Sequence, residues 1–362
     1  MSPERSKLAT VTDAVIIGAG PVGLFQVFEL GLLGLRAEVI DSLAQIGGQC
    51  TELYPDKPIY DIPAVPMCTA RELIERLEEQ IRPFGAGLHL GQEVTRVEKR
   101  ADGRFDVETS RGARFDAGSV IIAAGVGAFQ SRRLALAEAE RHEGRRLHYR
   151  VKDRELFRDR DIVILGGGDS ALDWTLDLLD SARSVVLVHR RADFRAAPAS
   201  VSQLFSLRDA GKVDFLEGQV RAVVETAGEL SGIHVTTPDG LTRTVSLEHL
   251  LVFWGLHPKL GPIAEWGLAL NRKTITVDTA RFQTNVAGIF AVGDINDYPG
   301  KKKLILSGFH ETALAAFAVR EYLRPGEKVH LQYTTTSPLL QKRLGVAADK
   351  PAREAHASAR GG

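Results

Sequence analysis

The feature that most constrains this chain is a glycine-rich turn that occurs twice, each time between an apolar strand and a helix. In the first copy, the run 14–17 meets Gly18, Gly20 and Gly23 in the pattern G-x-G-x-x-G, and residues 24–33 continue as a helix. Such glycines permit a tight turn, a close approach of backbone to a pyrophosphate and close packing of helix on strand. The free N–H groups at the start of the helix bind phosphate. The segment therefore predicts a dinucleotide-binding unit.

The second copy lies near the middle of the chain and has the same order of strand, turn and helix. The strand 161–165, apolar from residue 162, precedes Gly166, Gly168 and Ala171 in the pattern G-x-G-x-x-A, and residues 172–179 follow as a helix. A glycine motif alone is weak evidence, but the strand before it and the helix after it supply the context that dinucleotide binding requires. The sequence therefore predicts two nucleotide sites.

The two copies differ at the position that contacts the ribose. In the first, the strand 37–40 is followed by Asp41, 23 residues after Gly18, where an acid binds ribose hydroxyls. The matching position, 23 residues after Gly166, begins a basic run: His189, Arg190, Arg191 and, close behind, Arg195. A carboxylate repels a 2′-phosphate, whereas guanidinium groups bind one through charge-assisted hydrogen bonds. The first site therefore suits FAD and the second NADPH rather than NADH; the alternative for these arginines is a solvated strand end.

Composition narrows the class of protein. Lys plus Arg and Asp plus Glu both number 46, so no net charge draws the chain to nucleic acid or to an anionic membrane. No apolar run approaches the ~20 residues of a membrane span, and the polar N-terminus is unlike a signal peptide, so we expect a cytoplasmic protein. Cys50 and Cys68 are too few for a disulfide framework or a four-cysteine metal site, and no histidines have ligand spacing, so we expect no metal.

Two further strands indicate that one domain interrupts the other. Residues 119–125 form an apolar strand just before the second glycine turn, and residues 288–294 form another that ends in Gly-Asp, with a helix at 311–322. We expect an α/β fold of two Rossmann-like, three-layer (ββα) domains, with the FAD domain split by an inserted NADPH domain. The expected boundaries are 1–126 and 256–336 for the FAD domain, 127–255 for the NADPH domain and 337–362 for a C-terminal tail.

Several segments follow one another in a distinctive order: 18–25, 46–49, 53–61, 165–171, 189–191, 291–294 and 306–309. Together they resemble the ferredoxin–NADP reductases of the thioredoxin-reductase-like type, over about residues 13–336. The nucleotide motifs alone are shared by a large superfamily. The segment 53–61, Leu-Tyr-Pro-Asp-Lys-Pro-Ile-Tyr-Asp, is far more specific.

One departure from the parent superfamily bears on the reaction. Thioredoxin reductases carry a redox Cys-x-x-Cys in the inserted domain just before its glycine turn, and here that stretch, 147–153, holds no cysteine. Cys50 and Cys68 are 18 residues apart and are interpreted as small buried hydrophobic residues. Without a dithiol relay, electrons have to leave the flavin directly, toward a protein carrier or a small acceptor.

The resemblance implies roles for individual residues. Asp41 matches the acid on the adenosine ribose of FAD, and Gln49 lies at the flavin. Tyr54 and Tyr333 match the catalytic aromatic pair, one stacked on each face of the flavin, where stacking favours a planar ring and excludes water. Asp294 matches a hydrogen bond to the ribityl chain.

The remaining implied contacts fall into two groups. The others expected at FAD are Gly18, Gly20, Pro21, Val22, Gly23, Gly48, Asp61, Val94, Ala124, Gly125, Phe129 and Thr335. Those expected at NADPH are Gly166, Gly168, Asp169, Ser170, Ala171, His189, Arg190, Arg191 and Arg195. Val94 and Phe129 match apolar contacts, and Thr335 one near the flavin edge. Hydride transfer is chemistry of the cofactors themselves, so no general base is required.

The resemblance further implies an acidic electron carrier, ferredoxin or flavodoxin, as the partner, and a homodimer. A basic surface near the flavin would attract such a carrier, and two runs are candidates: Lys301, Lys302 and Lys303, and Arg132 with Arg133. An ordinary solvated loop is the alternative for the lysines. Two other functions stay open at this point, an NADPH oxidase or quinone reductase with a small acceptor, and a flavin redox sensor without turnover.

Overall fold

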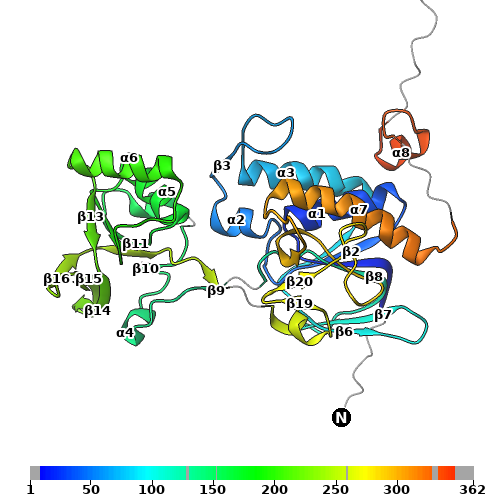
Figure 1. Ribbon diagram of the computed structural model, residues 1–362, viewed down its shortest axis with the longest axis horizontal. Coiled ribbons are helices and arrows are strands. Elements are labelled where there is room, and N and C mark those ends of the chain that lie inside the picture. The colour runs from blue at the N-terminus through cyan, green and yellow to red at the C-terminus, as the bar shows by residue number, and fades with distance from the viewer. Residues whose placement is uncertain (1–8, 128–129, 152, 258–259, 328–332, 347–362) are drawn as a thin grey trace, which may run out of the picture. The chain divides into compact units, whose positions relative to one another are not determined.

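The computed structural model describes residues 9–127, 130–151, 153–257, 260–327 and 333–346 (Figure 1). The chain forms two compact units. Unit 1 is built from residues 1–128 and 260–362, and unit 2 from residues 129–259. Unit 1 is therefore discontinuous in sequence, and unit 2 is inserted into it.

The main sheet of unit 1 has the strand order β5-β2-β1-β8-β7-β6, and β21 also pairs with β8. These strands are β1 (Thr10–Ile17), β2 (Ala37–Ile40), β5 (Gly87–His89), β6 (Val94–Lys99), β7 (Phe105–Thr109), β8 (Arg114–Ile122) and β21 (Ile289–Ala291). Strands β5, β2, β1, β8 and β21 run parallel to one another. Strands β6, β7 and β8 form an antiparallel meander. Because β21 lies beyond the insertion and β8 before it, their pairing closes the split domain.

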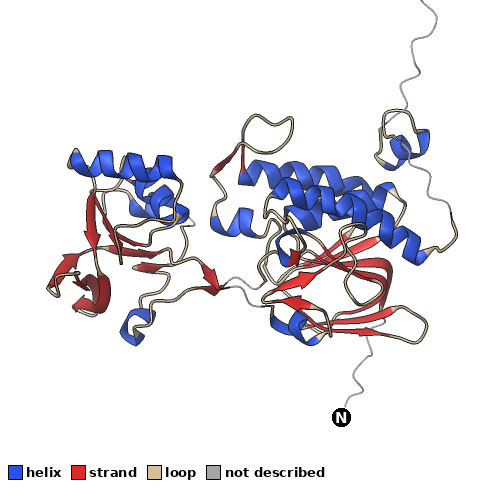
Figure 2. Ribbon diagram, viewed as in Figure 1, coloured by secondary structure: helices blue, strands red, loops and turns tan. Residues whose placement is uncertain are grey.

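Helices cover one face of this sheet, as Figure 2 shows within unit 1. They are α1 (Pro21–Leu32), α3 (Ala70–Ile81) and α7 (Ile305–Leu323), with α1 packed against both of the others. Shorter elements are α2 (Gln49–Leu53), β3 (Pro58–Ile59), β4 (Cys68–Thr69), β19 (Leu270–Asn271), β20 (Thr274–Thr276), β22 (Asn296–Asp297) and 3₁₀ turns at Arg82–Phe84, Gly261–Glu265 and Gly293–Ile295. Thr69 caps α3 with a capping box that includes Glu72, a pairing that fixes where this helix begins.

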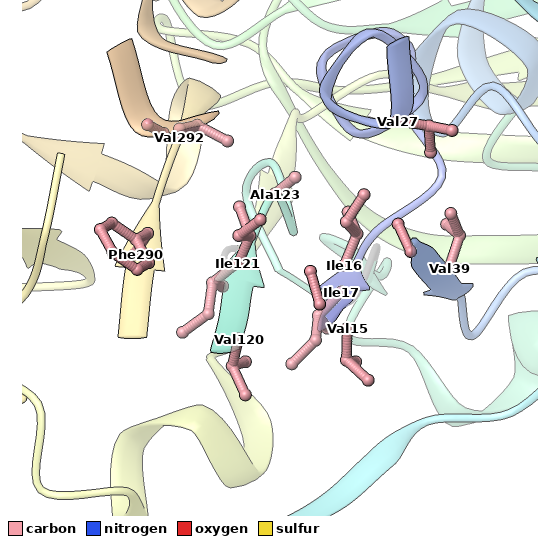
Figure 3. Packing of buried hydrophobic residues seen from close by; sticks show 14 of the residues in the cluster. Val15, Ile16, Ile17, Val27, Val39, Val120, Ile121, Ala123, Phe290 and Val292 are labelled. Carbon is pink, nitrogen blue, oxygen red and sulfur yellow. The ribbon is translucent and has the colours of Figure 1, made fainter. Parts of the chain in front are cut away.

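Apolar residues from neighbouring parallel strands form the core of unit 1 (Figure 3). Val15 and Ile16 of β1 lie beside Val120 and Ile121 of β8, and none of the four side chains is exposed. Phe290 of β21 is equally buried on the other side of β8. Strands buried on both faces are continuous apolar runs, which is why the sequence reveals them.

Two elements of unit 1 depart from the sequence-based expectation. Helix α7 begins at Ile305, earlier than the expected 311, and contains Gly308. A Cβ atom at Gly308 would lie 2.4 Å from Val22 Cγ2, so glycine is required there by packing on α1 rather than as a helix breaker. The expected tail also contains a helix, α8 (Pro338–Arg343), whose N-cap Ser337 accepts a hydrogen bond from the N–H of Leu340.

Unit 2 has a parallel sheet of order β10-β17-β11-β12-β13 and an antiparallel sheet of order β14-β15-β16. Its strands are β9 (Gln130–Ser131), β10 (Leu147–His148), β11 (Asp161–Leu165), β12 (Ser184–His189), β13 (Asp214–Glu217), β14 (Gln219–Thr226), β15 (Glu229–Thr236), β16 (Thr242–Ser246), β17 (His249–Val252) and β18 (Leu256–His257). Its helices are α4 (Ala137–Glu140), α5 (Asp169–Leu178), α6 (Pro198–Asp209) and a 3₁₀ turn at Arg154–Phe157.

Strand β11 separates two apolar clusters in unit 2. Val163 and Leu165 pack with residues of the antiparallel sheet, whereas Ile162 and Ile164 pack with α5 and α6. This alternation follows from the two-residue period of a strand. The structure thus confirms the expected α/β class with two Rossmann-like units. Within the described residues, none of the helices has the combination of length and apolar character that crossing a membrane requires.

Candidate functional site

The first glycine turn joins β1 to α1 and has no room for side chains at two positions. Gly18 has φ +113°, and a Cβ atom there would lie 2.4 Å from the carbonyl oxygen of Ala123. A Cβ atom at Gly23 would lie 1.9 Å from the carbonyl oxygen of Gly18. At Gly20, the N-cap of α1, nothing lies within 4 Å of the Cβ position. The space before α1 is therefore open, beside free N–H groups that can hold a phosphate.

Asp41 follows β2 and faces this turn. Its carboxylate accepts hydrogen bonds from the N–H of Ala19 at 2.6 Å and from the N–H of Leu43 at 2.8 Å. Burial raises the pKa of Asp41, and these two backbone bonds oppose the shift. Each oxygen thus has one fixed donor and keeps lone pairs for hydroxyl groups of a ribose.

Three segments that are far apart in sequence meet beside the turn. A Cβ atom on Gly48, the N-cap of α2, would lie 3.1 Å from Gly20 Cα. Burial raises the pKa of Asp294, and the side chain of Gln49, the residue after Gly48, opposes that shift, so the two side chains are neighbours. A Cβ atom at Gly125 would lie 3.4 Å from Gln49 Nε2. The structure therefore brings these residues together with the glycine turn, as a shared cofactor site requires.

Tyr54 ends α2 next to this cluster. Its hydroxyl lies 3.7 Å from Cys50 Sγ. Burial raises the pKa of the Tyr54 phenol, with Cys50, Asp294 and Asp61 adding to the shift, so the ring keeps its proton. Asp61 itself is exposed on the loop between β3 and β4. Tyr54 is thus a neutral, half-buried aromatic group beside Gln49.

Two other residues expected at the flavin are exposed and lie next to α8 in the sequence. Tyr333 is 66% exposed and Thr335 is also exposed, and Gln341 of α8 donates to the carbonyl of Thr335. Helix α8 packs at the C-terminal end of α1, where Arg343 donates to the carbonyl of Leu32. This end is about 18 Å from the glycine turn, given the 12 residues of α1. The expected stacking of Tyr333 on the flavin stays a prediction.

The remaining expected FAD contacts vary in their placement. Val94 is buried at the start of β6, and Ala124 is partly buried next to Gly125. Phe129 lies outside the described residues. Pro21 and Val22 form the first turn of α1, which begins three residues before the expected start at 24.

Unit 2 contains a cavity of about 610 Å³ at the carboxyl ends of its parallel strands. Its walls are the glycine turn 166–170, the end of β12 at 188–191, the segments 218–220 and 253–255, and the side chains of Arg132 and Arg195. A volume of this size suits a nucleotide. A cavity at this edge of an open parallel sheet lies where such folds bind their ligands.

The end of this cavity near β12 is basic. Among the residues that the structure describes, no carboxylate forms an ion pair with Arg190, Arg191 or Arg195. His189 Nε2 and Arg191 Nε are buried and have no hydrogen-bond partner. Burial lowers the pKa of His189, so its ring is neutral. Buried polar atoms of folded proteins are nearly always satisfied, so these two fit a site whose ligand supplies the missing partners.

The glycine turn and the basic segment are held together by backbone contacts. The N–H of Arg195 donates to the carbonyl of Gly167 at 2.8 Å, and the N–H of Ala197 donates to Asp169 Oδ1 at 2.8 Å. Asp169 and Ser170 form the exposed first turn of α5. The Asp169 carboxylate therefore fixes the position of the segment after β12 by accepting a hydrogen bond from its backbone.

Comparison with known proteins identifies relatives of this chain. Residues 12–320 match the family described as pyridine nucleotide-disulphide oxidoreductase. The chain is 62% identical to a ferredoxin–NADP reductase of Methylibium petroleiphilum, over 92% of this chain and 93% of the relative. It is 63% identical to ferredoxin–NADP reductase 2 of Cupriavidus pinatubonensis, over 92% and 91% of the two chains.

The chain belongs to the pyridine nucleotide-disulphide oxidoreductase family, among its ferredoxin–NADP reductases. The crystal structure of Lactococcus lactis thioredoxin reductase has the same fold, with a TM-score of 0.74 and 24% identity over 86% of this chain and 99% of that one. The resemblance that the sequence indicated is thus confirmed.

In this pyridine nucleotide-disulphide oxidoreductase, both cysteines are free and buried. Cys50 is 1% exposed and Cys68 is not exposed, and burial raises the pKa of the Cys50 thiol to about 11. A reactive thiol is instead accessible and has a lowered pKa. The described residues of this family member also hold no group of three His, Cys, Asp or Glu side chains placed to bind a metal.

The expected docking surfaces of this reductase need correction. Lys301 is not a surface cation, because its side chain is 6% exposed and pairs with Glu311. Arg133 pairs through two hydrogen bonds with Glu143, and Arg132 lines the cavity of unit 2. Lys302 and Lys303 remain exposed. Arg132 and Arg133 are exposed as well, so only Lys301 of the five basic residues lacks the surface position that docking requires.

The sequence also missed part of the cavity wall in this family member. The missed residues come from three segments: Arg132, 218–220 and 253–255. The last segment follows β17, which pairs with β11, so it lies next to the glycine turn. The apolar strand 249–252 before it was the available signal, since the residues after a parallel strand meet at the ligand-binding edge.

Proposed function

We propose that this chain is an FAD-dependent ferredoxin–NADP reductase that transfers electrons between NADPH and ferredoxin or flavodoxin. The relatives at 62–63% identity carry this name, and the aligned region spans more than nine-tenths of each chain. In this proposal unit 1 binds FAD and unit 2 binds NADPH.

The residues of unit 1 fit FAD. Asp41 would hold the adenosine ribose, and the open space at Gly20 would admit the pyrophosphate. Gln49, Asp294 and Tyr54 would contact the ribityl chain and the ring system. When bound, the flavin supplies the exchange between two-electron hydride transfer and single-electron transfer. The chain itself supplies binding, orientation and exclusion of water.

The cavity of unit 2 fits NADPH. Gly166, Gly168 and Ser170 would accommodate the pyrophosphate at the start of α5, and the unpaired arginines after β12 would bind the 2′-phosphate. His189 Nε2 and Arg191 Nε are the buried atoms that such a ligand would satisfy. These contacts would favour NADPH over NADH because NADH lacks the phosphate.

The observation that carries the choice of reaction is the state of the cysteines. The fold is that of a thioredoxin reductase, but neither Cys50 nor Cys68 is paired or accessible. A thiol relay is not available to such a chain, so electrons pass from the flavin directly to the acceptor. Lys302 and Lys303 are the proposed contact for an acidic carrier. The cytoplasmic location and the homodimer stay part of the proposal, and light scattering on the purified protein measures the dimer.

The decisive experiment compares acceptors. Purified protein should contain one FAD per chain, and NADPH should bleach the flavin absorbance under anaerobic conditions. The rate of NADPH oxidation is then measured with oxidised ferredoxin, oxidised flavodoxin and a quinone as alternative acceptors, each over a range of concentrations. We expect the highest kcat/KM with a protein carrier. A preference for quinone or oxygen would replace the proposal with the oxidase or quinone reductase function, and failure of NADPH to bleach the flavin would favour a sensor.

A further inference from the structure

A buried ion pair lies beside the proposed flavin site of unit 1. Lys301 follows the 3₁₀ turn Gly293–Ile295 and pairs with Glu311, in the second turn of α7. The Lys301 side chain is 6% exposed and that of Glu311 is fully buried. Burying two charges has a large desolvation cost, so the presence of this pair needs a structural or functional reason.

Glu311 is the centre of a saturated hydrogen-bond network. Its Oε2 accepts from the N–H of Gly293 at 2.7 Å and from Asn296 Nδ2 at 2.8 Å. Its Oε1 accepts from the Tyr298 hydroxyl at 2.9 Å and from Lys301 Nζ. Every donor except Lys301 comes from the residues between 293 and 298. The carboxylate therefore organises the short segment that follows β21.

Lys301 contacts the carbonyl of Gly293, whereas Glu311 contacts its N–H. Its Nζ donates to the carbonyl of Gly293 at 2.9 Å as well as to Glu311. The N–H of Gly293 is bound by one member of the ion pair and its carbonyl by the other. Gly293 has φ +78°, a conformation that glycine adopts readily and other residues rarely, and these charge-assisted bonds hold its peptide group from both sides.

The residue that this arrangement orients is Asp294. It directly follows Gly293, and its side chain is a neighbour of Gln49 at the proposed flavin site, since Gln49 opposes the rise in the pKa of Asp294 that burial causes. A Cβ atom at Gly293 would lie 3.3 Å from a methyl group of Val22, so the same peptide packs on the first turn of α1. A rotation of this peptide would move the Asp294 carboxylate relative to the glycine turn.

We propose that Lys301 and Glu311 are positioning residues that fix the Gly293–Asp294 peptide, and thereby hold the Asp294 carboxylate in place for the ribityl hydroxyls of FAD. The inference rests on the proposed binding of FAD to unit 1. It predicts that the ion pair contributes to cofactor affinity. Replacing a buried ion pair by apolar side chains of similar size is often tolerated, but here it also leaves the donors of Gly293, Asn296 and Tyr298 without their acceptor. FAD affinity and apoprotein stability are therefore measured separately.

The test uses the double variant Lys301→Met/Glu311→Leu in the full chain, with Lys302→Met as the matched control at the exposed neighbour. The dissociation constant of FAD is measured from flavin fluorescence quenching by apoprotein, and apoprotein stability from thermal unfolding. We expect the FAD dissociation constant to rise about tenfold in the double variant, as for the loss of a well-placed hydrogen bond, when affinity is measured at a temperature where the variant apoprotein is folded. The control should bind FAD as the wild type does.

A second measurement distinguishes positioning from general packing. In an Asp294→Ala background, the Lys301→Met/Glu311→Leu change should alter FAD affinity by less than about twofold, since its effect passes through Asp294. Visible circular dichroism of the bound flavin should change in the Lys301→Met/Glu311→Leu variant and not in the Lys302→Met control. Equal losses in both backgrounds would overturn the proposal, as would wild-type affinity in the double variant.

The design also separates this inference from the proposed function. Wild-type protein that binds no FAD would contradict the proposed function itself, whereas wild-type binding with an unaffected double variant contradicts only the positioning role. If the apolar pair gives no folded protein, Lys301→Gln/Glu311→Gln makes the same test, since it removes both charges and keeps the side chains polar. Wild-type FAD affinity in that variant would likewise overturn the inference.

Discussion

The imidazole ring of His189 lies directly against the backbone of Gly167. A Cβ atom at position 167 would come within 2.3 Å of His189 Nε2 and within 2.5 Å of two ring carbons. The middle glycine of the second turn is therefore required by a side chain of the basic segment. The pyrophosphate position and the 2′-phosphate position of the proposed NADPH site are sterically coupled through this contact.

The Gly167→Ala substitution should displace the His189 ring and, with it, the basic segment. Since misplacement of a binding group weakens the interactions it makes, we expect the KM for NADPH to rise at least about tenfold, with a smaller effect on NADH. Steady-state kinetics with both coenzymes, and calorimetric binding of 2′,5′-ADP, measure the effect. In a His189→Ala background the same change should cost little, and an equal cost there would disprove the steric coupling.

The Arg190→Ala/Arg191→Ala variant should lose coenzyme preference. Both side chains line the cavity wall and have no acidic partner among the described residues, so their charge is available for a phosphate. Two lost charge-assisted hydrogen bonds should raise the KM for NADPH about a hundredfold or more and leave NADH kinetics nearly unchanged. Arg208→Ala, on α6 of the same unit, is the matched control. Parallel loss with NADPH and NADH would assign the arginines a structural role instead.

Unit 2 should lose stability in mild acid because of a buried histidine pair. His148 Nε2 lies 3.1 Å from His249 Nδ1, and each residue is 8% exposed. Burial, followed by the charge of His148 and of nearby Arg146, lowers the pKa of His249 to about 4. The unfolded chain, with a histidine pKa of about 6.5, therefore takes up the proton first as the pH falls.

The stability from this pair should be complete above pH ~6.5 and should decrease as the pH falls toward 4, by up to about 1.4 kcal/mol per pH unit for one histidine. Thermal unfolding between pH 4.5 and 7.5 measures it. The His249→Asn variant keeps a polar group for His148 and should show a shallower pH dependence, even if it is less stable at pH 7. Identical slopes for both proteins would mean that other groups set the acid sensitivity.

The Lys302→Glu/Lys303→Glu variant should slow reduction of an acidic carrier. Attraction of this kind weakens as the Debye length falls from ~30 Å at 0.01 M salt to ~8 Å at 0.15 M. We expect a loss of about tenfold in kcat/KM for ferredoxin at low salt, with a flatter salt dependence. Quinone reduction is the control, because a neutral acceptor is not steered. Equal losses with both acceptors would indicate damage to the flavin site.

The sequence by itself determined the strands and the phosphate turns. The runs at 14–17 and 162–165 are buried on both faces, so they are continuous apolar segments that a sequence reveals. The sequence also predicts the glycine turns, since the positive φ of Gly18 and Gly166 has a steric cost for other residues. Asp41 and His189 could be matched because both directly follow, or end, the second strand of their units.

Tertiary structure decided which polar residues meet, because contacts between distant segments leave no local pattern. From sequence, three consecutive lysines predict a solvated basic run, yet Lys301 is buried because α7 places Glu311 beside it. The sequence places the start of the last long helix at 311, whereas α7 begins at Ile305 and includes Gly308, which packs against Val22 of α1. The positions of Gln49, Gly125 and Asp294 beside one turn follow from the parallel pairing of β1, β8 and β21, and that pairing joins residues separated by the whole of unit 2.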